Sequence, residues 1–259
     1  MDAPWVAERV RRAVAYRSGF RRSDTDGVRL VFGEADGLPG VVADRFGPVI
    51  VVQIHSLGME RWKETIAGEL VALEQPESLV FVNDDPIRAR EGLPLYRSVF
   101  YGPDLDSVCM LENGLTFQVD LRQGQKTGHF LDQKANHRFL QRFVKDKTVL
   151  DAFTYSGGFA LHAAAAGATS VEAVDISSAA LDLARENAHA NGLEEIRFVE
   201  ANAFDHLRNL HANGARFDVV VLDPPAFASS HKAQAGAVRG YKDINLGAMR
   251  LLPPGGLLA

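Results

Sequence analysis

The spacing of apolar side chains changes along the chain and divides it into regions. Near the start, Trp5, Val6, Val10 and Val14 recur at almost helical intervals, which predicts a helix over residues 5–17. Short apolar runs, separated by turns rich in Gly and Pro, follow and predict strands. These runs span 28–32, 41–43, 49–54 and 78–82, and a second helix is expected at 62–73.

A hairpin signal closes this first region. Asn113-Gly114 stands between the apolar runs 108–111 and 115–119, and this dipeptide favours a tight two-residue turn because both residues tolerate a positive φ. Helices and strands are therefore mixed before residue 118, without a regular alternation. We expect residues 1–117 to form a small α+β domain.

Helical and strand-like segments alternate over residues 118–259. The predicted helices span 132–143, 159–166, 178–191 and 204–212, and one more ends near 252. The predicted strands span 148–150, 170–174, 196–200 and 217–222. This alternation predicts a doubly wound parallel sheet, because right-handed crossovers put helices on its faces. A strand begins at 257–259, so we expect the natural chain to continue with further strands of the sheet.

Composition excludes several classes of protein. Of 259 residues, 46% are hydrophobic and 24% are charged, which fits a folded globular chain rather than a disordered one. No apolar run approaches the roughly 20 residues that cross a bilayer, and no secretion signal opens the chain. A single cysteine, Cys109, excludes internal disulfides and favours a cytoplasmic location. The spacing of the histidines and the cysteine indicates no metal site.

The charge pattern gives no general attraction to nucleic acid. The formal net charge is −5, so any RNA binding must be local. One local excess lies in the first domain, at Arg9, Arg11, Arg12, Arg17, Arg21 and Arg22. A solvated helix face explains this run somewhat better than an RNA-contacting role does, and both interpretations stay open.

Three acidic residues follow apolar runs in the second domain. Asp151, Asp175 and Asp223 each end a predicted strand or follow it. The carboxyl ends of parallel strands meet at one edge of the sheet, where ligands bind. After Asp151 the chain turns through Gly157-Gly158 into a predicted helix, whose first N–H groups face a ligand at that edge.

The turn differs from that of a dinucleotide-binding protein, which needs Gly-x-Gly-x-x-Gly for the approach of a pyrophosphate. A carboxylate at the strand end is a poor neighbour for phosphate and a good one for a cation. S-adenosylmethionine carries an ammonium and a sulfonium and no phosphate, so the charges favour it as the ligand. Asp175 stands where an acid holds a ribose diol, and Asn202 follows the third strand, where it can hydrogen-bond an adenine edge.

These motifs resemble those of Rossmann-like S-adenosylmethionine-dependent methyltransferases, at 151–159, at Asp175 and in the Asp-Pro-Pro-Ala-Phe run that starts at Asp223. Three longer stretches resemble the bacterial family that methylates C5 of a cytosine in 23S ribosomal RNA. They are 34–45, 124–133 and 239–245. The resemblance covers nearly the whole chain. It implies a Rossmann-like doubly wound methyltransferase sheet after a small α+β domain, S-adenosyl-L-methionine as cofactor, and ribosomal RNA as substrate.

The resemblance also implies the site residues. The cofactor contacts would be Gln125, Thr127, Asp151, Phe153, Tyr155, Ser156, Gly157, Asp175, Ile176, Asn202, Ala203 and Asp223. The target base would lie against Asp223, Pro224, Pro225 and Phe227, with Phe227 as a stacking platform. Many relatives have an acid in place of Asn202, whose amide oxygen can still accept a hydrogen bond from the adenine amino group.

Methylation of C5 also needs a nucleophile. This carbon becomes reactive only after a thiolate adds to C6 of the cytosine. The resemblance implies a cysteine for this step beyond Ala259, in a Ser-Cys-Ser-like segment, and an RNA-binding module of the PUA type before the region that begins here. Cys109 has no cationic neighbour in the sequence. We therefore expect Cys109 to be a structural, small apolar side chain rather than the nucleophile.

Two other functions stay open. The Asp-Pro-Pro-Ala-Phe run at 223–227 also resembles loops of methyltransferases that modify base nitrogens, where the lone pair attacks the methyl group and no cysteine is needed. The chain could also be a non-catalytic, cofactor-binding, RNA-associated protein. The polar run 229–236 suits a flap over the base pocket or an ordinary surface loop. Exposed strand edges in the first domain would allow a homodimer.

Overall fold

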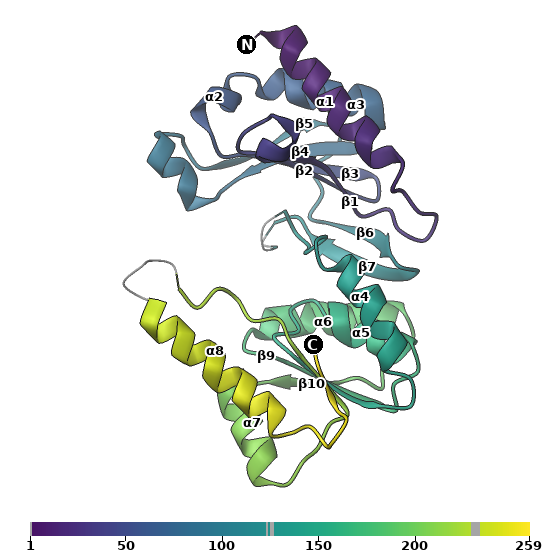
Figure 1. The fold of residues 1–259 in the computed structure, drawn as a ribbon. Coiled ribbons are helices and arrows are strands. Elements are labelled where there is room, and N and C mark those ends of the chain that lie inside the picture. Colours follow the sequence, from purple (N-terminus) through teal and green to yellow (C-terminus); the bar gives the residue numbers. More distant parts are fainter. Residues whose placement is uncertain (1, 123, 125–126, 229–233) are drawn as a thin grey trace. The chain divides into compact units, whose positions relative to one another are not determined.

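The structure is a computed structural model that describes residues 2–122, 124, 127–228 and 234–259. It contains two compact units, Met1–Asp132 and Gln133–Ala259, which run from purple to teal and from teal to yellow in Figure 1. The first unit is α+β and the second holds a parallel sheet, so the predicted fold class is confirmed. The predicted boundary at residue 117 falls within strand β7 (Leu115–Asp120) of the first unit.

A five-stranded sheet forms the centre of the first unit. Its strands are β1 (Val28–Phe32), β2 (Val41–Phe46), β3 (Val49–Ile54), β4 (Ser78–Asn83) and β5 (Tyr96–Tyr101). They lie in sequence order, with β3 and β4 parallel and the other neighbours antiparallel. Every residue of β3 and β4 is buried, which is typical of central strands covered on both faces. Strand β5 is an element that the sequence pattern does not predict.

Two helices, α1 (Ala3–Ser18) and α3 (Lys63–Glu74), cover one face of this sheet (Figure 1). The Asp2 carboxylate caps α1 by accepting a hydrogen bond from the Trp5 N–H at 3.0 Å. Val10 of α1 belongs to the same buried cluster as Ile50 and Val52 of β3. The valines of the predicted apolar stripe therefore face the core, whereas Trp5 at its start is 36% exposed. Short helical segments complete the connections: η1 (Gly33–Asp36), α2 (Leu57–Glu60) and η2 (Pro86–Glu91).

The predicted hairpin is present as β6 (Ser107–Glu112) and β7. Asn113 and Gly114 have φ values of 52° and 86°, as a tight primed turn requires. Side chains alternate along β6, with Val108 and Met110 buried and Cys109 exposed. The expectation that Cys109 packs as a structural apolar residue is therefore wrong, because the strand's two-residue period turns it away from the covered face.

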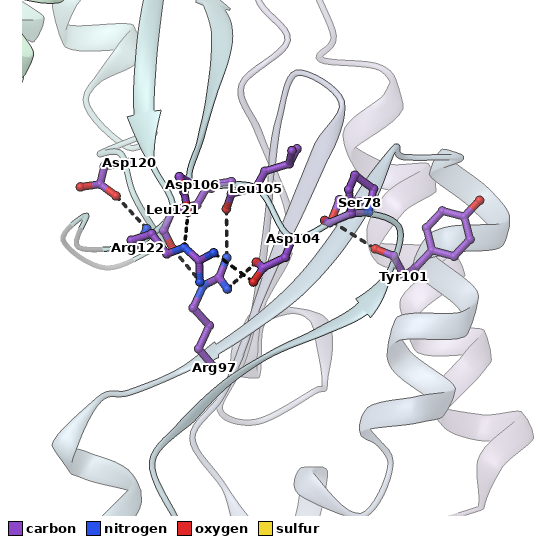
Figure 2. Close-up of polar contacts among 10 residues, drawn as sticks. Ser78, Arg97, Tyr101, Asp104, Leu105, Asp106, Asp120, Leu121 and Arg122 are labelled. Atoms are coloured by element: carbon purple, nitrogen blue, oxygen red, sulfur yellow. Dashed lines mark hydrogen bonds and ion pairs between the residues drawn. The ribbon is translucent and has the colours of Figure 1, made fainter.

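A polar network fixes the segment between β5 and the hairpin (Figure 2). The Asp104 carboxylate accepts from Arg97 Nη1 at 2.7 Å and from Arg122 Nη2 at 3.0 Å. The Ser78 hydroxyl donates to the Pro103 carbonyl at 2.8 Å. These bonds hold the connecting segment against the start of β4 and the residues that follow β7.

The second unit contains a parallel sheet. Its strands are β8 (Thr148–Ala152), β9 (Ser170–Asp175), β10 (Arg197–Glu200), β11 (Val219–Leu222) and β12 (Leu257–Leu258). Their order is β10-β9-β8-β11-β12, and all neighbours pair in parallel. The order reverses between β8 and β11. Open α/β sheets bind ligands outside the carboxyl edge at such a switch point.

Helices cover both faces of the parallel sheet. They are α4 (Lys134–Leu140), η3 (Gln141–Phe143), α5 (Gly158–Ala165), α6 (Ser178–Ala190), α7 (Ala203–Ala212) and α8 (Gln234–Met249). Helices α5 and α6 lie on one face, and α7 and α8 on the other (Figure 1). Leu207 of α7 and Ile244 of α8 pack in one cluster with Leu150 of β8. In the parts of the chain that the structure describes, no helix has the length and apolar character needed to span a bilayer.

Replacement of Gly102 should destabilise the first unit. Gly102 has a φ of +75°, and a Cβ there would lie 1.9 Å from the Glu77 carbonyl oxygen, a backbone atom that cannot easily move aside. We expect Gly102→Ala to lower the free energy of unfolding by about 3–5 kcal/mol. Gly92→Ala is the matched control, because Gly92 has a φ of +71° and nothing within 4 Å of an added Cβ. Its expected cost is about 1–2 kcal/mol. Equal losses in urea unfolding would contradict this account.

Candidate active site

The carboxyl ends of the parallel strands bring the predicted acids together. Asp151 is the next-to-last residue of β8, Asp175 is the last residue of β9, and Asp223 follows β11. The strand register aligns these ends, because Asp151 lies opposite Ala173 of β9 and Val221 of β11. Three carboxyl groups therefore line the edge of the sheet around its switch point.

The turn after β8 has an uncommon backbone conformation. Phe153, Tyr155 and Gly157 have φ values of 69°, 50° and 87°, and the left-handed region is rarely occupied by residues with a side chain. The N–H groups of Phe153 and Thr154 both donate to the Val174 carbonyl of β9, at 2.9 and 3.0 Å, and so hold the turn. Backbone strain that is held in this way is concentrated at ligand sites.

Two glycines let helix α5 begin close to its neighbours. A Cβ on Gly157 would lie 2.4 Å from the Leu161 side chain, and one on Gly158 would lie 2.6 Å from the His137 ring of α4. Asn187 of α6 donates from Nδ2 to the Ser156 carbonyl at 3.0 Å. The turn is therefore fixed from two helices, and nothing in the sequence singles out His137 or Asn187 for this task.

Asp151 joins the two ends of this turn. Its side chain is fully buried, and its Oδ2 accepts from the Thr154 hydroxyl at 2.6 Å and from the Ala160 N–H at 3.0 Å. The other oxygen, Oδ1, has no hydrogen-bond partner among the described residues. A buried carboxylate oxygen without a donor is costly, and a bound cation or N–H group would supply the missing partner.

Burial raises the pKa of Asp151 from its usual value of 3.8 to about 7, because the charged form loses its hydration. The negative charges of Asp223 and Asp175 raise this pKa further, whereas the hydrogen bonds from Thr154 and Ala160 lower it. The group therefore titrates near neutral pH, and a cationic ligand would favour its ionised form.

The Asp175 carboxylate is oriented by backbone donors. Its Oδ2 accepts from the Tyr155 N–H at 2.9 Å, and its Oδ1 accepts from the Ser177 N–H at 3.0 Å. The next side chain, Ile176, is 68% exposed. A fixed acid beside an exposed apolar side chain can contact the hydroxyl groups and the apolar ring face of one ligand.

Asn202 begins helix α7 as its N-cap. Its Oδ1 accepts from the N–H groups of Phe204 and Asp205, at 3.0 and 3.4 Å. We expected the Asn202 side-chain oxygen to accept a hydrogen bond from the adenine amino group. In the structure this oxygen bonds to the helix, so Nδ2 is the atom of the Asn202 amide that can contact a ligand. Ala203, the first residue of α7, is 7% exposed and packs in the core.

Gln133 positions the Asp223 carboxylate. Its Nε2 donates to Asp223 Oδ2 at 2.9 Å, and its Oε1 accepts from Asn136 Nδ2 at 2.7 Å. Asp223 and Pro225 are exposed and Pro224 is half-buried. Gln133 belongs to a stretch that carries the family resemblance, but its partner lies 90 residues away and only the fold reveals the contact.

Phe227 is held in an aromatic cluster. Its ring centroid lies 4.5 Å from that of Tyr241 in α8, 5.6 Å from Phe204 in α7 and 6.5 Å from Phe153. The Phe227 N–H also donates to the Tyr241 hydroxyl at 3.4 Å. Two helices therefore support the ring for which the sequence predicts a stacking role.

The remaining predicted cofactor contacts lie in the first unit. Thr127 is buried, and its hydroxyl donates to Asp44 Oδ2 at 2.6 Å. Arg29 donates to both oxygens of the same carboxylate, at 2.8 and 2.9 Å. The cofactor role of Thr127 stays a prediction. Gln125 lies outside the described residues, as do positions 229–233. The predicted loop at 229–236 extends too far, because residues 234–236 belong to helix α8.

The arginine run of the first unit is largely neutralised within that unit. All but Arg9 form ion pairs with acidic side chains, through Arg11–Glu69, Arg12–Glu8, Arg17–Asp36, Arg21–Glu74 and Arg22–Asp24. The guanidinium of Arg9 lies over the Trp5 ring, 4.9 Å from its centroid. These pairs favour the interpretation of the run as an ordinary charged helix face.

The sequence matches a family and named relatives. Residues 97–259 match the family described as S-adenosylmethionine-dependent methyltransferase. The chain is 44% identical over 264 residues to the Ribosomal RNA large subunit methyltransferase I of Shewanella amazonensis, and 41% identical over 262 residues to the protein of that name from Pseudoalteromonas translucida. Both matches cover 100% of this chain and 66% of the relative.

Solved structures of methyltransferases have a similar fold. SMU.776, described as a candidate methyltransferase and solved with SAH, superposes with a TM-score of 0.86 at 22% identity, over 100% of this chain and 67% of its own. The SAM-dependent methyltransferase of Agrobacterium tumefaciens superposes with a TM-score of 0.66 at 20% identity, over 92% of this chain and 73% of its own. At 20–22% sequence identity, these superpositions show a shared fold and do not show a shared function.

The chain belongs to the S-adenosylmethionine-dependent methyltransferase family, whose match covers more than half of its length. The family that the sequence motifs resemble is thereby confirmed. The chain spans 66% of the length of the curated relatives that it matches.

Asp151 should make the stability of the protein depend on pH. Its folded pKa of about 7 lies above the usual 3.8, so its contribution to stability is complete below 3.8 and is lost as the pH rises through 7. At about 1.4 kcal/mol per pKa unit, the loss is about 4 kcal/mol at most. Asp151→Asn carries no titrating group. Relative to the natural protein, it should gain stability steadily between about pH 4 and about pH 8.

Urea unfolding at several pH values, without cofactor, measures this difference. A constant difference between Asp151→Asn and the natural protein across that range would contradict the raised pKa.

Proposed function

We propose that the full-length protein methylates C5 of a cytosine in 23S ribosomal RNA, with S-adenosyl-L-methionine as the methyl donor. One observation carries the proposal: three acids gather at the switch point of the sheet, and the fully buried Asp151 keeps one oxygen without a partner among the described residues. An acidic, partly unsatisfied edge suits a ligand with an ammonium and a sulfonium group. The name of the curated relatives, Ribosomal RNA large subunit methyltransferase I, supports the substrate.

The turn after β8 would receive the amino-acid end of the cofactor. The free oxygen of Asp151 would accept a hydrogen bond from the ammonium group. The left-handed residues Phe153 and Tyr155 turn the chain sharply, which brings Ser156 and Gly157 to the N-terminus of α5. There the helix dipole and the first N–H groups favour the carboxylate of the same ligand.

The ends of β9 and β10 would receive the adenosine. Asp175, which two backbone N–H groups orient, would accept hydrogen bonds from the ribose hydroxyls. The exposed side chain of Ile176 would lie against the adenine ring. Because the oxygen of Asn202 caps α7, its Nδ2 would donate to a ring nitrogen of adenine, and the backbone of Ala203 would complete this wall.

The loop after β11 would hold the target base. Asp223, which Gln133 orients, would accept a hydrogen bond from the exocyclic amino group of cytosine. Pro224 and Pro225 restrict the loop because their φ angles are fixed. Phe227, supported by its aromatic neighbours, would stack on a base that has been turned out of the RNA.

The cofactor supplies an electrophilic methyl group when it is bound. The residues of this chain would bind and orient, and Asp223 would hold the cytosine so that C5 faces the methyl group. Addition of a thiolate to C6 requires a cysteine, which the family resemblance implies beyond Ala259. Ribosomal RNA as partner and a single cysteine in 259 residues support a cytoplasmic location. The homodimer stays a prediction.

A second candidate function is methylation of a base nitrogen. One contact favours it: the amide N–H₂ of Gln133 donates to Asp223 at 2.9 Å, as an exocyclic amine of a base would. In that chemistry the carboxylate orients the amine, the lone pair attacks the methyl group, and no thiolate takes part.

Binding of the cofactor should follow the ionisation of Asp151. With a pKa of about 7, the ionised fraction rises about tenfold between about pH 6 and about pH 7.5. We expect the affinity for S-adenosyl-L-methionine to rise by a similar factor in isothermal titration calorimetry. Asp151→Asn should bind weakly at every pH in that range. Glu195→Gln, which removes an exposed carboxylate before the start of β10, at the opposite edge of the sheet, should keep the affinity and the pH dependence of the natural protein.

The reaction product decides between the candidate functions. The full-length protein should transfer a labelled methyl group to unmodified 23S RNA, and nucleoside mass spectrometry should find 5-methylcytosine. Asp223→Asn should lower the turnover by at least about tenfold, since it removes the charge that orients the amine. A methyl group on a base nitrogen would contradict methylation of C5 and support the second candidate function. Cofactor binding without transfer to any RNA would leave a non-catalytic protein.

A further inference from the structure

A cavity of about 300 Å³ lies at the amino-terminal edge of the parallel sheet, where β8, β11 and β12 begin. This edge is opposite to the one that carries the three acids. The residues around the cavity include Phe143, Lys147, Asp218, Pro253 and Pro254. Its volume is at the lower end of the range for small-molecule sites, which suits a single planar base.

An exposed aromatic pair adjoins the cavity. Phe143, which lines it, is 41% exposed, and Phe139 is 57% exposed. Their ring centroids are 5.2 Å apart, and the guanidinium of Arg142 lies 5.4 Å from one centroid and 5.9 Å from the other. Exposed rings with an arginine beside them form the stacking surface on which proteins bind the bases of single strands.

The same segment is positively charged. Residues 138–147 include Arg138, Arg142, Lys145 and Lys147 and one acid, Asp146. The segment therefore carries a charge of +3 in a chain of net charge −5. Asp146 has a φ of 58°, and its N–H donates to the Gly167 carbonyl at 2.9 Å, which fixes the turn between the two lysines. Arg11, Arg12 and Arg17 of α1 form salt bridges. Among the described residues Lys145 and Lys147 form none, although the charge of Lys147 acts on Asp218, so their ammonium groups can reach phosphates.

Asp218 adds a hydrogen-bond acceptor to the cavity. Its Oδ2 accepts from the N–H and the hydroxyl of Thr148, at 2.9 and 3.0 Å. These bonds, together with the charge of Lys147, lower the pKa of Asp218, so the group is a carboxylate at neutral pH. Oδ1 remains to accept from a ligand. The cavity thus offers an aromatic ring and two prolines for the base ring of a nucleotide. It also offers a carboxylate oxygen for the N–H edge of that base and a cation for a phosphate.

We propose that this cavity and the adjoining rings bind single-stranded RNA at a nucleotide other than the one that is methylated. One base would enter between Phe143 and the two prolines, with its N–H edge toward Asp218. Guanine suits this position because its N1–H and its amino group donate on the same side. A second base would stack on Phe139, while Lys145 and Lys147 contact phosphates. This inference rests on the proposed RNA substrate.

Fluorescence anisotropy of the full-length protein with a labelled oligouridine that carries one central guanine tests this site. Phe143→Ala should weaken binding about tenfold, as expected for the loss of one base–aromatic stack. Phe20→Ala is the matched control. Phe20 is 69% exposed and stacks on Tyr16 at 5.4 Å, far from this cavity in the sequence, so its loss should leave the affinity unchanged. Equal affinity of Phe143→Ala and the natural protein, or an equal loss in both variants, would overturn the proposal.

Two further variants test the base edge and the charge. Asp218→Asn keeps an oxygen for Thr148 and replaces the other by a donor. It should lose the preference for the guanine-containing oligomer over the all-uridine one. Lys147→Ala should reduce the slope of log affinity against log salt concentration by about 0.7, the value for one phosphate contact on a single strand. An unchanged preference and an unchanged slope would both count against this site.

Two parallel measurements separate this site from the proposed activity. Every variant should keep the cofactor affinity of the natural protein and remain folded at the temperature of the assay. If the natural protein binds the oligomer through Phe143 but methylates no RNA, the proposed activity fails and this site stands. If it methylates 23S RNA and Phe143→Ala has the same KM for RNA and the same affinity for the oligomer, this inference fails alone.

Discussion

The architecture of the second unit and the chemistry of its edge depend on one buried carboxylate. Asp151 accepts from Thr154 and Ala160 and so connects the end of β8 to the first turn of α5. Its burial makes the ionised form expensive. The fold without ligand therefore favours the protonated acid, whereas a cationic cofactor favours the carboxylate. Stability and ligand binding make opposite demands on the same side chain, a conflict that is common at functional sites.

The turn after β8, next to this carboxylate, is held in place by three helices. Gly158 leaves space for the His137 ring, and Asn187 holds the carbonyl of Ser156. Helices α4, α5 and α6 thus converge on one turn of backbone. The acid at the end of β9 is fixed in turn by the backbone of Tyr155. A substitution in any of these helices can reach the cofactor edge through the turn, without touching the cofactor.

Local patterns in the sequence predict most elements, and contacts between distant residues account for what they miss. The hairpin is predictable because Asn113-Gly114 specifies its own turn, and the acids are predictable because they follow apolar strands. Strand β5 could not be predicted, because none of its six residues is buried and its apolar and polar residues do not alternate regularly. Gln133 with Asp223 and Tyr241 with Phe227 join separate segments of chain, so no local spacing could have indicated them.

The buried Asp44 has a consequence for the synthesis of the chain. This carboxylate accepts from Arg29, 15 residues earlier, and from Thr127, 83 residues later. The last strand of the sheet ends at Tyr101, 26 residues before Thr127, and at about 5–20 residues per second the ribosome needs roughly 1–5 seconds to add this stretch. The sheet can therefore form with Asp44 bonded to Arg29 alone, and the bond from Thr127 can be added only when that segment emerges.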